Sequence, residues 1–238
     1  MKKLSALFIA LLFSAGMTLA QSNEASIEQV GDDHDADVEQ SGDYNVANVD
    51  QDGAGGIADI DQYGSSNEAF ITQEGVTGGE RTSGSITQTG GENEASILQE
   101  ESNVKSSEIV QDGYRNEATV ESVGGGRADA ADIYQEGNDN QATILQSLTS
   151  ASSAVISQYG NDNEAMIEND GSPLDASIMQ EGDLNVANIE DTFGAGGNTA
   201  DIGQFGNRNT ADIFMDNSDG TADIQQTGDN NNASISQY

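Results

Sequence analysis

The segment that decides the fold is IQQTGDNNNASI, residues 224–235. Written as a motif, it reads I-x-Q-x-G-x-x-N-x-A-x-I, and Val replaces Ile in some copies. Further copies start at Ile60 and Ile202, and all nine copies keep the Gln, the Gly, the Asn and the Ala. Agreement at four positions in nine copies indicates an array of structural repeats rather than a single irregular core.

The spacing inside each copy is typical of β-strands. Asn, Ala, Ile and Gln stand two residues apart, so in an extended strand their side chains point to one face. Rows of this kind recur mostly every 11 residues, and rows that begin with Asn alternate with rows that begin with a variable residue. The sequence therefore predicts an all-β fold, a β-solenoid of about 9.5 strand–turn–strand coils of about 22 residues each. Its two parallel sheets would stack as in amyloid.

The two edges of this solenoid are predicted to differ. Every step from a variable row to an Asn row is 11 residues long, whereas all five longer steps run from an Asn row to a variable row. One edge is thus a tight turn in which Gly supplies a positive φ, and the other edge accommodates insertions. The predicted turn glycines are Gly42, Gly64, Gly90, Gly113, Gly137, Gly160, Gly182, Gly206 and Gly228.

Stacked coils place equivalent side chains about 4.8 Å apart, so amide side chains can form ladders along the stack. Such ladders satisfy buried amides that would otherwise be costly. The predicted Gln ladder consists of Gln40, Gln62, Gln88, Gln111, Gln135, Gln158, Gln180, Gln204 and Gln226. The predicted Asn ladder consists of Asn45, Asn67, Asn93, Asn116, Asn140, Asn163, Asn185, Asn209 and Asn231.

Residues 1–20 have the pattern of a secretory signal peptide. Lys2 and Lys3 precede an apolar run over 4–13, and a small-residue segment ends at Ala20. We therefore expect residues 21–238 to form the repeat domain of a secreted, extracellular protein. Without the two lysines, five basic residues remain against 42 acidic ones, a net charge of −37. Such a charge excludes nucleic acid as a partner, because phosphate binding requires clustered Lys and Arg.

Six acidic residues follow the Ala of a variable row and should form one outward column. They are Asp37, Asp59, Glu108, Asp132, Asp201 and Asp223. Carboxylate oxygens are the ligands that Ca²⁺ prefers. A solvated acidic face is the simpler interpretation, so we predict no metal site and no cofactor.

No catalytic constellation is apparent, and we expect that the chain is not an enzyme. His34 is the single histidine, cysteine is absent, and no phosphate-binding or dinucleotide motif occurs. Two functions stay open on the residues alone. One is a fibre subunit that stacks end to end, and the other is a monomeric acidic surface protein that binds Ca²⁺ or glycan.

The repeat resembles the curlin repeat of bacterial curli over nearly all of residues 21–238. The closing segment NNASISQY, residues 231–238, is similar to the end of the major curli subunits rather than of the nucleators. This resemblance implies a functional amyloid fibre on the cell surface, with roles in biofilm matrix and adhesion. It also implies an outer-membrane secretion pore and a nucleator subunit as partners, besides further copies of the chain itself.

Overall fold

A computed structural model describes residues 22–76, 82–100, 103–124, 127–147, 152–171, 173–192, 197–216 and 219–238. This part of the chain consists of nineteen β-strands joined by turns and contains no helix. No helix among these residues is long and apolar enough to cross a membrane. The predicted signal peptide, residues 1–20, lies outside the described residues.

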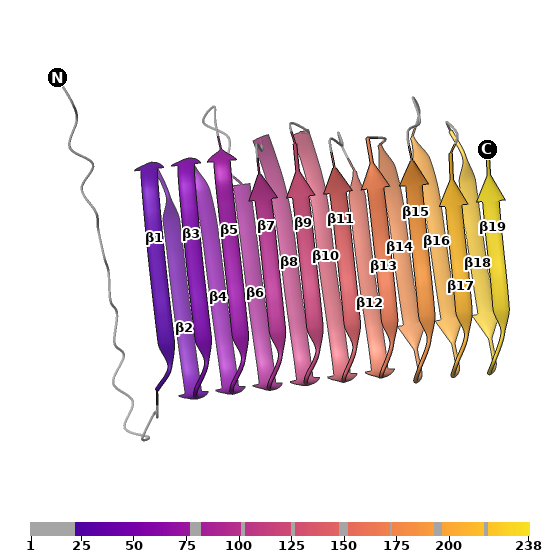
Figure 1. The fold of residues 1–238 in the computed structure, drawn as a ribbon, viewed down its shortest axis with the longest axis horizontal. Coiled ribbons are helices and arrows are strands. Elements are labelled where there is room, and N and C mark those ends of the chain that lie inside the picture. Colours follow the sequence, from indigo (N-terminus) through magenta and orange to yellow (C-terminus); the bar gives the residue numbers. More distant parts are fainter. Residues whose placement is uncertain are drawn as a thin grey trace.

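The strands form two sheets of ten and nine strands that face each other (Figure 1). The ten-stranded sheet contains β1 (Glu24–Asp32), β3 (Val46–Ala54), β5 (Glu68–Val76), β7 (Glu94–Glu100), β9 (Glu117–Val123), β11 (Gln141–Ser147), β13 (Glu164–Asp170), β15 (Val186–Thr192), β17 (Thr210–Met215) and β19 (Asn232–Gln237). The nine-stranded sheet contains β2 (Asp35–Asp43), β4 (Gly56–Ser65), β6 (Thr82–Gly91), β8 (Asn103–Tyr114), β10 (Arg127–Asn138), β12 (Ser153–Asn161), β14 (Leu174–Glu181), β16 (Asn198–Phe205) and β18 (Thr221–Thr227).

Consecutive strands alternate between the sheets, and every strand pairs in parallel with the next strand but one. The pairing is in register with the repeat, so that Ala142 pairs with Ala165 and Ile144 with Ile167. Equivalent residues of successive coils are 22 to 26 residues apart. These features confirm the predicted β-solenoid with two parallel sheets.

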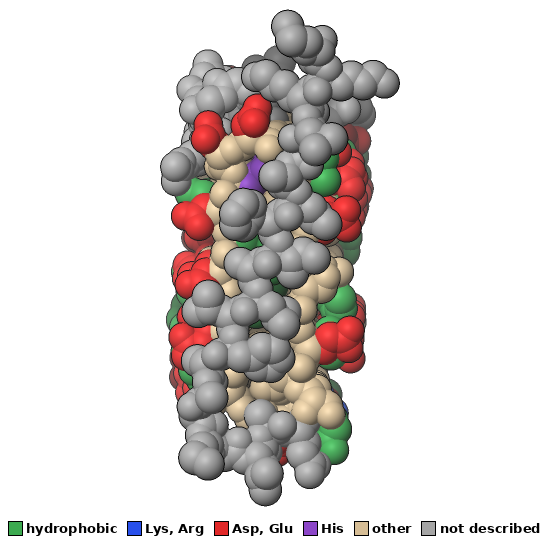
Figure 2. Space-filling model, turned by 90° about the vertical axis from the view of Figure 1, so that its left-hand side faces the viewer, with side chains coloured by type: hydrophobic (Ala, Val, Ile, Leu, Met, Phe, Trp, Pro, Cys, Tyr) green, Lys and Arg blue, Asp and Glu red, His purple; other side chains and the backbone are tan. Residues whose placement is uncertain are grey.

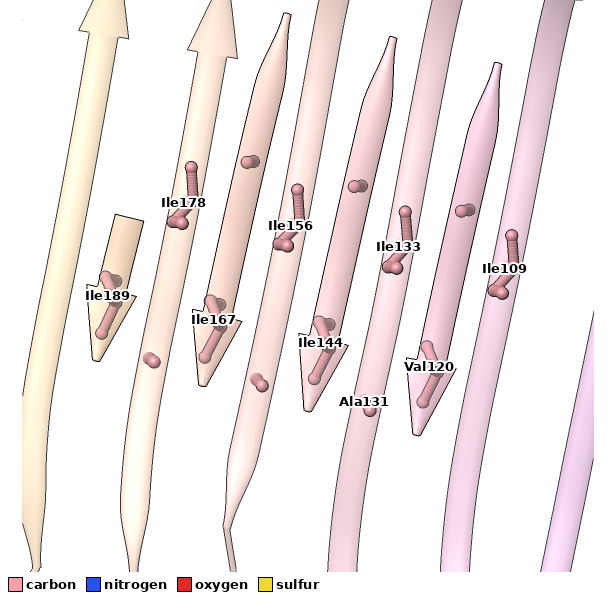
Figure 3. Close-up of a cluster of buried hydrophobic side chains, with 14 of the residues drawn as sticks. Ile109, Val120, Ala131, Ile133, Ile144, Ile156, Ile167, Ile178 and Ile189 are labelled. Atoms are coloured by element: carbon pink, nitrogen blue, oxygen red, sulfur yellow. The ribbon is translucent and has the colours of Figure 1, made fainter. Parts of the chain in front are cut away.

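The core lies between the sheets as two interleaved rows of Ile and Val with Ala beside them (Figure 3). In the inner coils these side chains are almost fully buried; Ile133 and Ile156, for example, are 0 % exposed. The alternation of the motif explains this burial, since every second residue of a strand points inward. At the two ends of the stack the same positions are only partly buried, at Ile27, Val38 and Ile235.

Candidate self-assembly interface

The nine predicted glutamines of the variable rows lie in one column of the nine-stranded sheet. From Gln40 to Gln226, each Nε2 donates to the Oε1 of the next Gln at 2.8 to 2.9 Å. Each Nε2 also donates to a backbone carbonyl of the facing sheet, as Gln111 does to Glu94 O at 3.0 Å. Both hydrogens of each inner amide are therefore used, and every donor points toward the C-terminal end of the stack.

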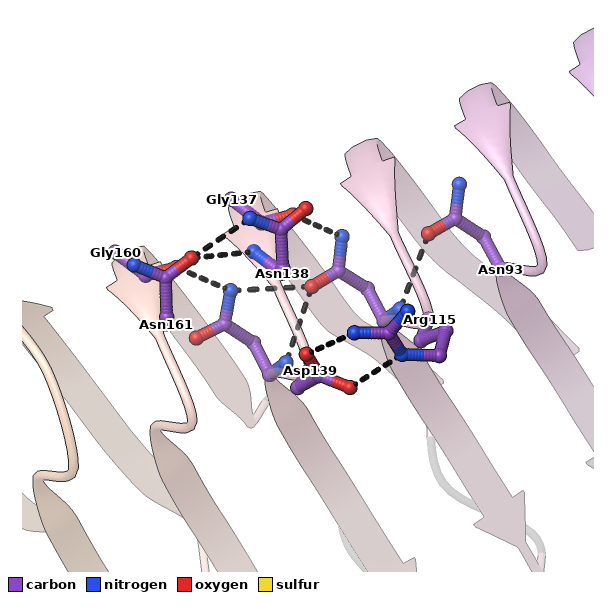
Figure 4. Close-up of polar contacts among 9 residues, drawn as sticks. Asn93, Arg115, Gly137, Asn138, Asp139, Gly160 and Asn161 are labelled. Carbon is purple, nitrogen blue, oxygen red and sulfur yellow. Dashed lines mark hydrogen bonds and ion pairs between the residues drawn. The ribbon is translucent and has the colours of Figure 1, made fainter.

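The asparagines lie at the tight-turn edge, and their ladder runs in the opposite direction. Asn163 Nδ2 donates to Asn140 Oδ1 at 3.1 Å, and the Asn163 backbone N–H donates to the same oxygen. The Nδ2 groups from Asn45 to Asn185 also donate to the carbonyl of a turn glycine at 2.8 to 3.3 Å (Figure 4). The Asn column thus ties neighbouring coils together and fixes the turn between the sheets.

The turn glycines form a column in which no side chain fits. All nine have φ between 101° and 135°. A Cβ on any of the first eight would lie 1.8 to 2.3 Å from the carbonyl oxygen of the next turn glycine. Gly228, at the C-terminal end of the column, differs because the nearest atom to its Cβ position is Asn231 Nδ2 at 3.7 Å.

Each tight turn contains a second left-handed residue that was not predicted from the sequence. The residue just before each ladder Asn has φ between 54° and 61°, as in Ser66 and Leu184. Besides Asp and Asn, which favour this conformation, these positions hold Tyr, Arg and Leu, which rarely adopt it. Residue type therefore carried no signal, and the constant two-residue spacing between Gly and Asn was the only trace of it.

The Asn rows contain another Gln ladder that the predicted sites did not include. Gln29, Gln51, Gln73 and Gln99 are joined by Nε2 to Oε1 hydrogen bonds of 2.8 Å. Ser122 occupies the next position of this column, so the ladder ends there. In these rows a Gln stands two residues after the inward Ile or Val, and this spacing could have predicted the ladder.

Charged residues also lie inside the solenoid, at the edge that carries the insertions. Lys105 and Asp129 are neighbours in register and are 2 % and 3 % exposed. Burial lowers the pKa of Lys105, an effect that Asp129 and Glu100 oppose. Asp191 is fully buried, which raises its pKa, and its Oδ1 accepts a hydrogen bond of 2.8 Å from Asn198 Nδ2.

The six predicted acids do form an outward column, but they lie in it as three pairs in register. Asp37 pairs with Asp59, Glu108 with Asp132 and Asp201 with Asp223. Ser85, Val155 and Ser177 separate the pairs. The facing sheet carries an unbroken run of three, Glu68, Glu94 and Glu117, that the sequence analysis missed.

Stacking changes the titration of this acidic column. Burial, and then the charge of the paired carboxylate, raises the pKa of Asp59 beside Asp37 and of Asp132 beside Glu108. The described residues include no group of three or more His, Asp or Glu side chains placed to hold a metal ion. His34 Nδ1 instead accepts a hydrogen bond from the Gly56 N–H at 3.2 Å.

The model of the curlin associated repeat matches residues 20–53, 42–75 and 126–171. These segments cover coils at the N-terminal end and in the middle of the solenoid, each with the Gln, Gly and Asn columns described above. No curated protein matches the sequence. Repeat motif, coil geometry and model match agree that these segments of the chain are curlin associated repeats.

Proposed function

We propose that the chain is a structural subunit of an extracellular, curli-like amyloid fibre that grows by end-to-end stacking and serves biofilm matrix and adhesion. The observation that carries this proposal is the state of the two end faces. Their strands keep the inward motif of the inner coils, yet Ile27, Val38 and Ile235 are only partly buried. Another copy stacked on each end would bury them as the inner residues are buried.

The backbone at the ends supports the same conclusion. In the inner Asn rows, the residue before the Ala donates its N–H to the next coil, as Thr210 does to Asn231 O at 2.8 Å. The equivalent group of β19 is the N–H of Asn232, which faces the open end. An unpaired strand edge of this kind is a template for a further strand.

The match to the curlin associated repeat adds weight, because proteins built from this repeat are structural and not enzymatic. On the same basis we propose secretion through an outer-membrane pore and growth from a nucleator subunit. The predicted signal peptide agrees with this route.

A proline at the open edge tests the proposal. Asn231 O and Gln237 O accept hydrogen bonds from the backbone N–H groups of Thr210 and Asp216, so residues 232, 234 and 236 direct their backbone groups toward the open end. Ser234→Pro removes one N–H from that edge and leaves the β17–β19 hydrogen bonds in place. Ser234→Thr is the matched control, because it keeps the N–H.

We expect the wild type and Ser234→Thr to form unbranched fibres with a 4.8 Å meridional reflection, measured by thioflavin fluorescence, electron microscopy and fibre diffraction. Ser234→Pro should elongate at least about tenfold more slowly, the rate effect of 1.4 kcal/mol. A wild type that stays monomeric for days at high concentration, with seeds and with calcium, would refute the fibre.

The second candidate is a monomeric protein whose stacked carboxylate pairs bind Ca²⁺ or whose surface binds glycan. The in-register pair of Asp37 and Asp59 is the observation that keeps the calcium version open. Calorimetric binding of Ca²⁺ by a chain that forms no fibre would favour this candidate.

A further inference from the structure

We infer that successive copies in the fibre are rotated by half a turn about its long axis, so that each copy places its sheets on the opposite sides from its neighbour. In this joint, β1 of one copy pairs with β18 of the preceding copy, and β2 pairs with β19. The inference rests on the proposed fibre function and specifies its contact surface.

The unequal numbers of strands in the two sheets favour the half turn. β1 and β19 both belong to the ten-stranded sheet, and β2 and β18 are the outer strands of the nine-stranded sheet. If copies stacked without rotation, β1 would pair with β19, and a gap one strand wide would separate β18 from β2. Half a turn exchanges the two sheets, so each side of the fibre then continues without a gap.

Strand direction allows this exchange. The two sheets run in opposite directions, as the arrows of Figure 1 show. Half a turn about the long axis reverses the direction of each strand and also moves it to the other side. Every strand therefore remains parallel to its new neighbour, and the joint has two paired strand edges instead of one.

The inward residues then stay in register. Rows of both kinds share the spacing of Ala, Ile or Val, and Gln, so Ala25, Ile27 and Gln29 would lie on Ala222, Ile224 and Gln226. Likewise, residues 36, 38 and 40 would lie on residues 233, 235 and 237. The apolar and Gln columns thus pass through the joint unbroken.

The ladders also fix the orientation of the joint as head to tail. Gln226 Nε2 donates one hydrogen to Thr210 O. Its second hydrogen points toward the open end, in the direction in which each inner Gln donates to the next Gln of the ladder. Gln29 donates to Gln51 and therefore presents its Oε1 at the N-terminal end. A donor thus meets an acceptor only between unlike ends.

The turn between β1 and β2 also fits the rotated joint, and it shares its conformation with the β3–β4 turn, where Gly53 has φ 127° and Gly55 φ 81°. It lies at the edge that carries insertions elsewhere, yet Gly31 (φ 131°) and Asp33 (φ 60°) reproduce the tight-turn pattern of Gly228 (φ 101°) and Asn230 (φ 59°). In the rotated joint this turn lies on the Gly228 turn. Each of the other eight turn glycines has the carbonyl of the next coil over its Cβ position, and in the rotated joint the Gly31 carbonyl would take this place over Gly228.

The charges of the two ends complement this joint. The outward residues of β1 and β2 are mostly acidic, and Figure 2 shows acids on both flanks of this end. The outward residues of β18 and β19 are neutral except for Asp223, which the rotated register places against Ser26. Acidic side chains therefore face hydroxyl and amide groups, whereas two N-terminal ends would repel each other.

Cysteine pairs distinguish the rotated joint from the unrotated one, and the chain contains no other cysteine. Ser236 faces Glu39 of the next copy in the rotated joint and Glu28 in the unrotated one. The variants Ser236→Cys/Glu39→Cys and Ser236→Cys/Glu28→Cys lose the same charge and are matched. Neighbouring strands lie about 4.8 Å apart, within the Cα separation of a disulfide.

Fibres of each variant are oxidised mildly and run on a non-reducing gel. The variant Glu28→Cys/Asp50→Cys, in which the two positions are in-register neighbours, provides the intramolecular control. We expect most subunits of the Ser236/Glu39 pair to be cross-linked into oligomers, at least about tenfold more than the Ser236/Glu28 pair. The reverse result, equal cross-linking of both pairs, or none in either while the control oxidises, would overturn the inference.

Electron cryomicroscopy gives an independent readout. Half a turn per subunit with a rise of about 46 Å, nine and a half strand spacings, is expected for the rotated joint. A rise of about 48 Å, ten spacings, without the half turn would overturn it and leave the fibre function intact. Absence of any fibre would instead refute the function itself.

Discussion

The turn-glycine column allows a matched test of how tightly the coils stack. Gly137 and Gly228 both have a φ that side chains rarely adopt, 121° and 101°, so an Ala at either position strains the backbone. That strain costs about 1–3 kcal/mol in both variants. Only Gly137 has another coil over it, with its Cβ position 1.9 Å from the Gly160 carbonyl oxygen.

Real Cβ atoms essentially never approach a heavy atom more closely than 3.0 Å, so Gly137→Ala must push the two turns apart by about 1 Å. The Gly160 carbonyl also accepts the 2.8 Å hydrogen bond from Asn140 Nδ2. Loss of this bond with the groups left buried costs about 1–3 kcal/mol. Gly137→Ala should therefore lower the free energy of unfolding by about 1–3 kcal/mol more than Gly228→Ala.

Urea unfolding followed by circular dichroism measures this difference, with the chain kept dilute so that it does not assemble. Equal losses of stability in the two variants would refute the close approach of the turns. In fibre growth the order should change, because Gly228 meets the next copy in the rotated joint. Gly228→Ala should then slow elongation despite its milder effect on the single chain.

Three further predictions concern the edges, the acidic faces and the buried acid. Two residues inserted between Gly160 and Asn161 should disrupt assembly more than two inserted between residues 195 and 196, and equal growth rates would contradict the difference between the edges. The raised pKa values of Asp59 and Asp132 mean that their ionisation opposes stacking, and this cost disappears as pH falls through those values. Because copies with a net charge of −37 also repel each other, fibre growth should accelerate toward pH 4 and in 1 M salt, where the Debye length is about 3 Å, and replacement of the acidic column by Asn or Ser should weaken both effects. Asp191→Asn should raise stability at pH 7, because the buried carboxylate has a raised pKa, and urea unfolding should show this gain shrinking on acidification.

The amino-acid sequence by itself determined the fold class, the strand positions and the inward set of residues. The reason is the strict spacing of Asn, Ala, Ile and Gln, which permits only one strand face and one register. The same regularity named the Gln and Asn columns and distinguished the tight edge from the edge with insertions. The position of a residue in its row was sufficient to predict these columns, because equivalent rows must lie over one another in a stack.

Only the tertiary structure showed the direction of the hydrogen bonds in the ladders and the burial of charged side chains at the edge that carries the insertions. Amide orientation depends on which backbone carbonyls are within reach, so the opposite polarities of the Gln and Asn ladders are not encoded in residue type. Lys105, Asp129 and Asp191 occupy inward positions of their rows, and only the structure shows that these charged side chains are almost fully buried there. The sequence places Gly31 and Gly228 alike, each four residues after an inward Ile, but the shared left-handed conformation at Asp33 and Asn230 appears only in the structure.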